Sequence, residues 1–271
     1  MTDTTSPTLS GLPGPAFTTR TRPDLVAATS AVESKSDDHE GESVTYKLLY
    51  FKLHGMAATT RILLAISGFR WEDVYPSDWS KEKEKVPLGV MPVLYEIHSN
   101  QDPRDPFVLE IPESEAIERY LARKLGLLGR DLWEETAINV FYCSSNAVMS
   151  LYVNKVLLAF SDTKARELIK FVSKDIPVWI TQHEKWLQRN GTNGFYVGDQ
   201  LSLADIRSVV CVDRFLTIPE CKDLISPIAT PGLWKLKQNL ESNPRYAAWI
   251  TSEEFEAINA STRQRLAVLS G

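Results

Sequence analysis

The sequence predicts an α+β protein in which a small mixed domain precedes an all-α domain. Residues 44–127 alternate between short runs of strand length and amphipathic helical segments. After Gly129, long helical windows follow one another and no convincing strand pattern interrupts them. The chain has 271 residues, of which 43% are hydrophobic and 24% charged, as expected for a globular protein of one or two domains.

Three elements open the first domain. "VTYKLLY" (44–50) combines β-branched and aromatic residues at strand length. "HGMAATTRILLAISG" (54–68) spaces its apolar residues as a helix does and closes on glycine, a common residue after a helix end. "WEDVY" (71–75) predicts a second short strand, and the polar "DWSKEKEK" after it predicts an exposed turn or helix.

A hairpin and a helix complete this domain. "MPVLYEI" (91–97) and "FVLEI" (107–111) alternate as hairpin strands on either side of a polar, proline-bearing loop. "PESEAIERYLARKLGL" (112–127) is an amphipathic helix with proline at its start. The order βαβ followed by ββα predicts a thioredoxin-like domain over residues 44–127.

The second domain, residues 131–258, is predicted from helical periodicity alone. Pro177 predicts a kink or break in one of its helices. The helical windows lie near 131–159, 164–190, 202–215 and 231–250. Residues 1–43 are rich in Thr, Ser, Pro and Gly and predict a mobile N-terminal tail, with a short helix near 24–32, and residues 259–271 predict a C-terminal tail.

Charge and cysteine content exclude several classes of function. The net charge is −5 and no basic block occurs, so we expect no nucleic-acid partner. No run of eighteen apolar residues predicts a membrane span, and no basic and then apolar N-terminus predicts a secretory signal. Three scattered cysteines without metal-ligand spacing predict no metal site and favour the reducing cytoplasm.

An acidic residue inside an apolar run distinguishes "GDQLSLADI" (198–206). Ser202 and Asp205 have the spacing of a capping box, with Asp in place of the usual Glu or Gln. Such a box satisfies the free amides of a helix start without water, so it suits a helix that begins in a protein core. We therefore expect Asp205 to have a structural role rather than a catalytic one.

Five segments together resemble glutathione transferases of the sigma type. The resemblance covers roughly residues 44–255 and implies a homodimer, a glutathione site in the first domain and a pocket for an electrophile between the two domains. The segments are similar, in order, to the family's opening, the stretch from its second helix into its third strand, its third helix, its capping box and its closing helix: "YKLLYFKLHGMAATTRILLAISG", "DWSKEKEKVPLGVMPVL", "ESEAIERYLARKLGL", "GDQLSLADI" and "NPRYAAWI".

Tyr50 is the predicted catalytic residue. Glutathione reacts as its thiolate, and a free thiol with a pKa of about 8.5 is only slightly ionised at pH 7. A hydroxyl that donates to the sulfur favours the anion. Tyr50 ends the first predicted strand and matches the tyrosine with this role in the resembled family. Otherwise it would be a strand aromatic buried in the sheet, as we predict for Tyr46.

The resemblance implies four residues for the peptide part of glutathione. Pro92 would be cis, so that the Met91 backbone pairs with the cysteinyl backbone like an added strand. Ser114 and the following helix N-terminus would bind the γ-glutamyl carboxylate, and Glu113 the α-ammonium group. The alternatives are a plain turn proline and simple helix capping.

Trp79 and Lys83 match the sigma pattern for the glycyl carboxylate, to which an indole N–H and an ammonium group donate. Lys83 could equally belong to a solvated charge run.

The second-substrate pocket would lie where the tyrosine loop faces the fourth helix. Its candidate residues, some of which could instead be helix core, are His54, Met56, Asn146, Met149, Tyr152 and Val153.

Departures from the family pattern weaken the predicted site. His54 and Met56 stand where sigma sequences often have arginine, and Val90 stands where lysine is common. The acidic residues of the family's fourth helix are replaced by Cys143, Asn146 and Ala147. Cys143 is not expected to be a nucleophile, because cysteine-type relatives place that residue at the start of the first helix.

The sequence thus predicts an enzyme that uses glutathione as substrate or cofactor. It would conjugate glutathione to an apolar electrophile, or use it in isomerisation or elimination, for example on a specialised metabolite. The alternative is a non-catalytic protein of the same fold that binds glutathione or hydrophobic ligands, and the departures motivate it. An unrelated α+β module would require all these matches to be coincidental.

Overall fold

The computed structural model describes residues 43–99 and 107–270, so the predicted N-terminal tail and its short helix lie outside the described residues. The chain divides into two compact units that are not consecutive in sequence. The first takes the chain up to Phe51 together with Gly68–Ile117. The second takes Lys52–Ser67 together with Glu118 and all that follows.

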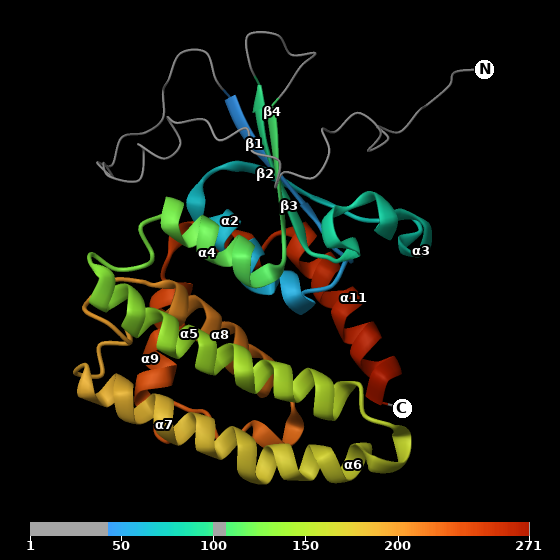
Figure 1. Cartoon of the computed structure of the whole chain (residues 1–271). Coiled ribbons are helices and arrows are strands. Elements are labelled where there is room, and N and C mark those ends of the chain that lie inside the picture. Colours follow the sequence, from blue (N-terminus) through green and yellow to red (C-terminus); the bar gives the residue numbers. More distant parts are fainter. Residues whose placement is uncertain (1–42, 100–106, 271) are drawn as a thin grey trace. The chain divides into compact units, whose positions relative to one another are not determined.

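The first unit contains a four-stranded sheet with the order β2-β1-β3-β4 (Figure 1). The strands are β1 Ser43–Leu49, β2 Arg70–Val74, β3 Val93–Ser99 and β4 Phe107–Pro112. β1 and β2 are parallel, whereas β3 is antiparallel to both β1 and β4. All four strands were predicted, and their ends differ from the predicted ones by at most two residues.

Short helical segments connect these strands and cover part of the sheet. The charged run after β2 forms α3 and a 3₁₀ turn, and a second 3₁₀ turn precedes β3. The segments are α3 Trp79–Glu82, η4 Lys83–Lys85 and η5 Pro87–Gly89, and α4 Ser114–Lys124 follows β4. One apolar cluster joins Val86 of this connection to Leu49, Val93, Tyr95 and Val108 of the strands. The predicted order βαβ then ββα is confirmed.

The described residues of the second unit are helical and contain no strand. Its first helix, α2, covers Ala58–Ser67 and follows the 3₁₀ turn η3 (Gly55–Ala57). The later elements are α5 Leu132–Tyr152, η6 Val153–Leu157, α6 Ser161–Lys170, η7 Phe171–Asp175, α7 Ile176–Arg189, α8 Leu203–Leu216, η8 Pro219–Cys221, α9 Pro231–Glu241, α10 Pro244–Ile250 and α11 Glu253–Ser270.

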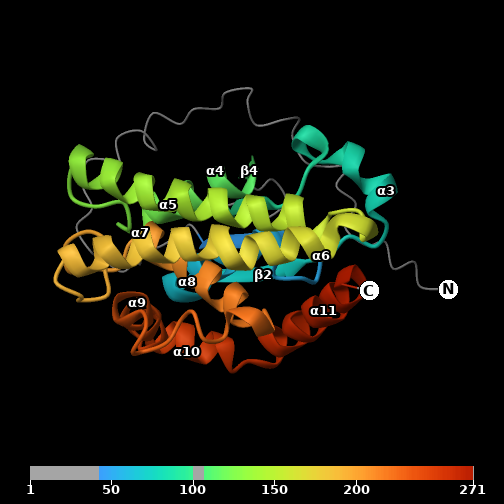
Figure 2. The ribbon, with the colours of Figure 1, turned by 90° about the horizontal axis from the view of Figure 1, so that it is seen from below.

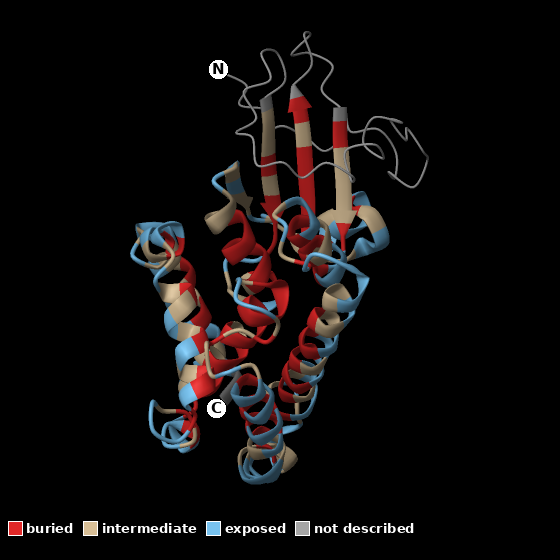
Figure 3. Ribbon diagram, turned by 90° about the vertical axis from the view of Figure 1, so that its left-hand side faces the viewer, coloured by how far each residue is buried: buried red, intermediate tan, exposed pale blue. Residues whose placement is uncertain are grey.

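Two long helical runs form the centre of the second unit. In Figures 1 and 2, α5 lies beside the run from α6 through α7, and the chain follows the two in opposite directions. Both η6 and η7 are π-helical, and Pro177 lies in the first turn of α7 directly after η7. At the kink or break predicted from Pro177, the helical run continues but changes from π-helical to α-helical hydrogen bonding. Buried residues, red in Figure 3, recur along α5 and α7, whereas α6 has none.

Helix α2 is anchored to the second unit although it lies between β1 and β2 in the chain. The Arg207 Nη1 atom of α8 donates to Thr59 Oγ1 over 3.2 Å. From α10, Arg245 Nη1 donates to the carbonyl oxygens of Ile66 (3.1 Å) and Ser67 (3.0 Å), the last carbonyls of α2. Cations at such carbonyls stabilise a helix end.

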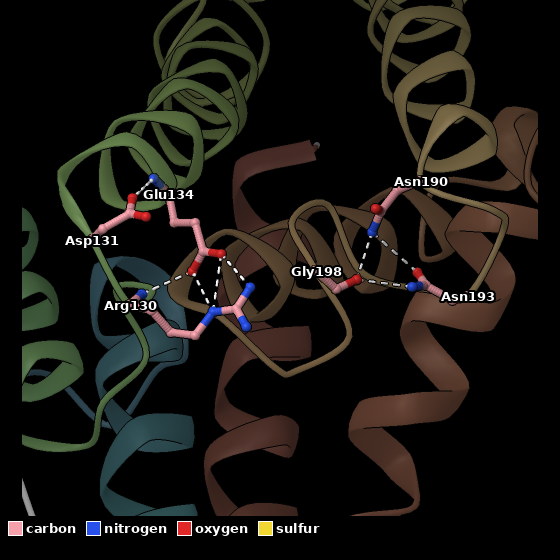
Figure 4. A network of polar contacts seen from close by, with 6 residues as sticks. All are labelled: Arg130, Asp131, Glu134, Asn190, Asn193 and Gly198. Carbon is pink, nitrogen blue, oxygen red and sulfur yellow. Dashed lines mark hydrogen bonds and ion pairs between the residues drawn. The ribbon is translucent and has the colours of Figure 1, made fainter.

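The capping box predicted in "GDQLSLADI" is confirmed. Ser202 is the N-cap of α8, and the two side chains exchange hydrogen bonds with each other's backbone amides. The loop before it is held by Asn190 and Asn193, whose amide groups donate to the Gly198 carbonyl over 2.8 Å and 2.9 Å (Figure 4). Asp131 caps α5 by accepting from the Glu134 N–H over 2.8 Å.

Residues 259–270, which we assigned to a C-terminal tail, continue helix α11 to Ser270.

Within the described ranges, no helix is both long enough and apolar enough to cross a membrane. Within the same ranges, no group of three or more His, Cys, Asp or Glu side chains could hold a metal ion. Cys143 is exposed, Cys211 and Cys221 are buried, and all three are free.

Candidate functional site

The register of the strands brings four chain segments to one edge of the sheet. Leu49, the last residue of β1, lies opposite Val93, the first residue of β3. Val93 in turn lies opposite Pro112, the last residue of β4. Leu49 also pairs with Val74, the last residue of β2. The ends of β1, β2 and β4 and the start of β3 therefore share this edge.

Residues from each segment adjoin that edge, and they include most of the predicted glutathione site. Tyr50 follows Leu49 directly, Pro92 precedes Val93, and Glu113 follows Pro112. Trp79 begins α3, five positions after Val74, the last residue of β2. Fold topology thus gathers groups that are up to 63 positions apart in the sequence, from residue 50 to residue 113.

Tyr50 is 9% exposed, and its backbone N–H donates to the Val74 carbonyl over 3.1 Å. Its ring meets the Phe51 ring edge-on at 5.7 Å, and Phe51 meets Trp79 in the same manner at 6.3 Å. The aromatic groups at the edge therefore form a chain from Tyr50 to α3. Tyr46 is 2% exposed and stacks on Phe69, as predicted for a core residue.

The Met91–Pro92 peptide bond is cis, as predicted. Pro92 is buried, and Met91 is partly buried against the apolar cluster of this unit. Met91 precedes the first paired residue of β3, so its backbone lies beyond the ladder of the sheet. An extended peptide can add to a sheet at such a position through main-chain hydrogen bonds.

Glu113 has a backbone φ of 72°, in the left-handed region that side-chain-bearing residues seldom adopt. Its side chain is exposed, and its carbonyl accepts from the Ile117 N–H over 3.0 Å, which places it at the start of α4. Ser114, the first residue of α4, is 6% exposed. Strained backbone of this kind is concentrated at binding and catalytic sites.

Trp79 is partly buried, and Asp78 caps its helix by accepting from the Ser80 N–H over 3.1 Å. The charges of the following run differ in their partners. Lys81 forms an ion pair with Asp78 at 2.8 Å. Lys83 is exposed and, among the residues that the structure describes, has no ion-pair partner. Its ammonium group is therefore open to an external anion.

His54 lies in the second unit, in contact with the C-terminal helix. Its backbone N–H donates to Thr262 Oγ1 over 2.9 Å, and its imidazole ring lies 4.9 Å from the Phe255 ring. Its Nε2 atom is buried without a hydrogen-bond partner among the described residues. Burial, then the charges of Arg61 and Arg214, lower the pKa of His54 to about 4, so the imidazole is neutral at pH 7.

The sequence did not point to these neighbours of His54. Phe255 and Thr262 belong to α11, and Thr262 lies in the segment that we assigned to a tail. Arg214 lies in the last turn of α8, where a cation is usual for helix-dipole reasons. No local pattern links residue 54 to positions some 160 to 210 residues later, so only the fold identifies them.

The other pocket candidates lie in the second unit. Met56 is 39% exposed, whereas Asn146, Met149 and Tyr152 of α5 are buried. Val153 begins η6 and is partly buried. Tyr152 packs on Phe171 with ring centroids 5.3 Å apart. Such burial is what helix-core packing requires, so their role in a ligand pocket stays a prediction.

Two of the three positions at which the resembled family has acidic residues face solvent. Cys143 is exposed and its Sγ atom lies 3.6 Å from Arg119 Nη2, and Ala147 is exposed as well.

A small pocket of about 60 Å³ lies between Gly126–Arg130 and the loop before α8. It contains none of the predicted site residues and is too small for a tripeptide, since ligand pockets usually measure hundreds of Å³.

Comparison with known proteins gives matches to one family. Residues 150–253 match the family model described as "Glutathione S-transferase, C-terminal domain". S-crystallin SL11 of Nototodarus sloanii is 27% identical over 212 residues, which cover 76% of this chain and 95% of that protein. Hematopoietic prostaglandin D synthase of Gallus gallus is 29% identical, covering 79% and 98%. A glutathione S-transferase of Dirofilaria immitis is 30% identical over 166 residues, covering 60% and 73%.

Solved structures show similarity to the same family. The Pi-class glutathione S-transferase of Onchocerca volvulus superimposes with a TM-score of 0.63 at 25% identity, covering 80% of this chain and 94% of that one. The superposition therefore covers most of both chains.

Proposed function

The chain belongs to the glutathione S-transferase superfamily as a sigma-like member, and on that premise we propose that it activates glutathione as a thiolate through Tyr50. The observation that carries the proposal is the shared sheet edge, where Tyr50, Pro92 and Glu113 adjoin paired strand ends. A peptide that adds to this edge at Met91 would bring its central sulfur toward the end of β1.

Each residue of this edge has a defined task in the proposal. The Met91 backbone pairs with the cysteinyl residue of glutathione. Ser114 and the free amides at the start of α4 bind the γ-glutamyl carboxylate, and Glu113 binds the α-ammonium group. Trp79 and Lys83 donate to the glycyl carboxylate. The strained backbone of Glu113 supports these assignments, and so does Lys83, which has no ion-pair partner among the described residues.

The reaction is nucleophilic substitution or addition by sulfur. With 1-chloro-2,4-dinitrobenzene, the thiolate forms a carbon–sulfur bond and chloride leaves with its bonding electrons. The Tyr50 O–H donates to the sulfur and lowers the pKa of the thiol, and one pKa unit corresponds to about 1.4 kcal/mol. Glutathione would serve as cofactor rather than substrate in an isomerisation, the use suggested by the relatives named prostaglandin D synthase.

Replacement of Tyr50 by phenylalanine tests the proposal. We expect Tyr50→Phe to lower kcat/KM for glutathione conjugation about 10- to 100-fold, because an O–H bond to an anion contributes about 1.5–3 kcal/mol. The apparent pKa of the pH–rate profile should rise toward that of free glutathione, about 8.5–9. Steady-state rates between pH 6 and 9 measure both quantities.

Tyr46→Phe is the matched control, because Tyr46 is a core phenol in β1, the strand that Tyr50 follows. It should leave the pH profile unchanged. A Tyr50→Phe variant with the rate and pH profile of the wild type would contradict the assignment of Tyr50.

A second candidate is a non-catalytic protein that binds glutathione or hydrophobic ligands. Met56 and His54, where sigma sequences often carry arginine, favour it, and so do relatives named S-crystallin rather than after an enzyme. Retention on immobilised glutathione without turnover of a panel of electrophiles would support this candidate. Turnover that depends on Tyr50 would exclude it.

We also propose a homodimer in the cytoplasm. The resemblance to glutathione transferases supports the dimer, and the three free cysteines support a reducing compartment. Light scattering coupled to size-exclusion chromatography would give the mass of the assembly in solution, to be compared with 30.5 kDa for one chain.

A further inference from the structure

The bend between η6 and α6 holds two large apolar side chains in solvent. Leu158 is 62% exposed and Phe160 is 83% exposed. The Leu158 N–H donates to the Val153 carbonyl over 3.0 Å, and the Phe160 carbonyl accepts from the N–H groups of Thr163 and Lys164, each over 3.0 Å. The backbone of the bend is therefore fixed while both side chains point outward. In Figures 1 and 2 the bend lies where the chain turns from the α5 run into α6.

Helix α6 extends this exposed surface. It has no buried residue, and its Ile169 is 67% exposed. Arg166, Lys170 and Lys174 are also exposed and follow one another at intervals of four residues. Residues at this spacing lie on the same side of a helix, and Ile169 is next to Lys170 in the chain. The exposed surface of this run thus combines apolar and cationic side chains.

Positive charge is concentrated on the same run. From Val153 to Asp175 the side chains carry a net charge of +2, although the whole chain has a net charge of −5. Arg166 forms an ion pair with Glu167 at 3.3 Å. The cations of this run that have no ion pair among the described residues are Lys155, Lys164, Lys170 and Lys174. The acidic side chains of the run are Asp162, Glu167 and Asp175.

This combination of groups favours a lipid surface as the partner. A second copy of the same surface would bring like charges together, which is unfavourable. An anionic bilayer attracts lysine and arginine to its surface and takes up large apolar side chains at the level of its headgroups. Lysine side chains can lay their aliphatic stems along apolar surface and keep their ammonium groups in water. A bilayer therefore complements the charges and the apolar bend together, without a shaped pocket for each side chain.

We propose that this surface binds anionic membranes, with Leu158 and Phe160 inserted among the lipid headgroups. Lys155, Lys170 and Lys174 would bind the negative charges of the headgroups. All of these residues belong to the second unit. The inference goes beyond the proposed function and does not depend on it. Binding of this kind would bring the protein to the place where apolar electrophiles partition.

Sedimentation of the full chain with lipid vesicles tests the inference. The probes are vesicles of phosphatidylcholine alone and vesicles that also contain about 30% phosphatidylserine. In about 0.1 M salt we expect the partition coefficient to be at least about tenfold higher for the anionic vesicles, and about 0.5 M salt should remove most of this difference by screening. A chain with a net charge of −5 and no local basic surface would avoid anionic vesicles. Equal partition onto both kinds of vesicle, or none onto either, would overturn the inference.

Phe160→Ser tests the apolar part of the surface. It should lower partition onto the anionic vesicles about tenfold, because a large side chain no longer leaves water on binding. Ile228→Ser is the matched control, since Ile228 is 93% exposed and lies outside this run. Both residues are exposed, so urea unfolding should give the wild-type free energy for both variants. Equal effects of the two substitutions on partition would contradict insertion of the bend.

Lys155→Gln combined with Lys170→Gln tests the cationic part and should lower partition about tenfold. The control is Lys185→Gln with Lys235→Gln, which changes the net charge equally at exposed lysines of α7 and α9. If both pairs have the same effect, net charge rather than this surface decides, and the inference is wrong. Binding of polyglutamate without binding of vesicles would assign the surface to an acidic protein and would overturn the inference as well. Tyr50→Phe should bind vesicles as the wild type does, because partition requires no turnover.

Discussion

At the scale of single residues, Asp205 shows how one buried carboxylate can stabilise a helix start. It is fully buried and accepts from the N–H groups of Ser202 (2.8 Å) and Tyr196 (3.0 Å) and from the Ser202 hydroxyl (2.6 Å). Burial raises the pKa of Asp205 to about 7, against the opposing effect of these hydrogen bonds. Its donors have no access to water, so none could be satisfied by solvent if the carboxylate were removed.

Asp205→Ala should therefore lower the free energy of unfolding by about 3 kcal/mol or more, since each buried donor left unsatisfied costs about 1–3 kcal/mol. Asp131→Ala is the comparison, because Asp131 caps α5 in the same way but is exposed. Loss of an exposed cap costs about 1 kcal/mol. Urea unfolding of both variants measures the difference, and equal losses would show that burial of the box does not matter.

Residues differ in how far the sequence reveals them. The strand end before Tyr50 and the capping box of Asp205 could be predicted because each is a local pattern. The contacts of His54 with Phe255 and Thr262 could not be predicted, because Thr262 lies 208 positions later in the chain.

At the scale of elements, His183 of α7 links three parts of the helical unit. Its Nε2 atom lies 2.9 Å from Ser144 Oγ of α5, and its Nδ1 atom lies 2.6 Å from the Tyr196 hydroxyl in the loop before α8. Trp179 stacks on the ring at 4.2 Å. Burial lowers the pKa of His183 from 6.5 to about 3, so the imidazole stays neutral in the folded protein.

This pKa predicts loss of stability in acid. Below pH 6.5 the unfolded chain binds a proton at residue 183 that the folded protein does not bind until about pH 3, so stability falls as pH falls through this window. Between pH 7.5 and 5.5 the loss from His183 is about 1.4 kcal/mol. His183→Gln should be less stable than the wild type at pH 7.5 but should lack this part of the pH dependence.

Ser144→Ala is the control for that measurement, because it removes a partner of His183 and leaves the titrating group in place. Its unfolding free energy should fall with pH as in the wild type. His54, with its pKa of about 4, contributes in the same direction and is present in all three proteins. An unchanged pH dependence in His183→Gln would mean that residue 183 is not the titrating group.

Secondary-structure elements were predicted well where the spacing of apolar residues determines their type. They were predicted less well where contacts between residues distant in sequence determine their position. The strands alternate polar and apolar residues, so their ends were predicted within two residues. The assignment of α2 to the helical unit depends on Arg207 and Arg245, which lie about 150 to 180 positions after the atoms they bind. The π-helical segments η6 and η7 were not predicted from the sequence.

At the scale of the whole molecule, ligand binding and stability are linked. A ligand that binds only the folded protein stabilises it by RT ln(1 + [L]/Kd), about 2.7 kcal/mol at a concentration of 100 Kd. Glutathione should therefore raise the unfolding free energy by this amount. S-methylglutathione, whose sulfur cannot ionise, should stabilise nearly as well, because the proposed contacts to Met91 and Ser114 do not involve the sulfur.

Variants then separate binding from catalysis. Tyr50→Phe should keep most of the stabilisation by glutathione although it loses turnover. Ser114→Ala should weaken binding about tenfold and so reduce the stabilisation at a fixed concentration by about 1.4 kcal/mol. Ser150→Ala, an exposed serine of α5, should behave as the wild type. If glutathione stabilises Ser114→Ala and the wild type equally, the peptide does not bind at the start of α4, and the proposed site at the sheet edge is wrong.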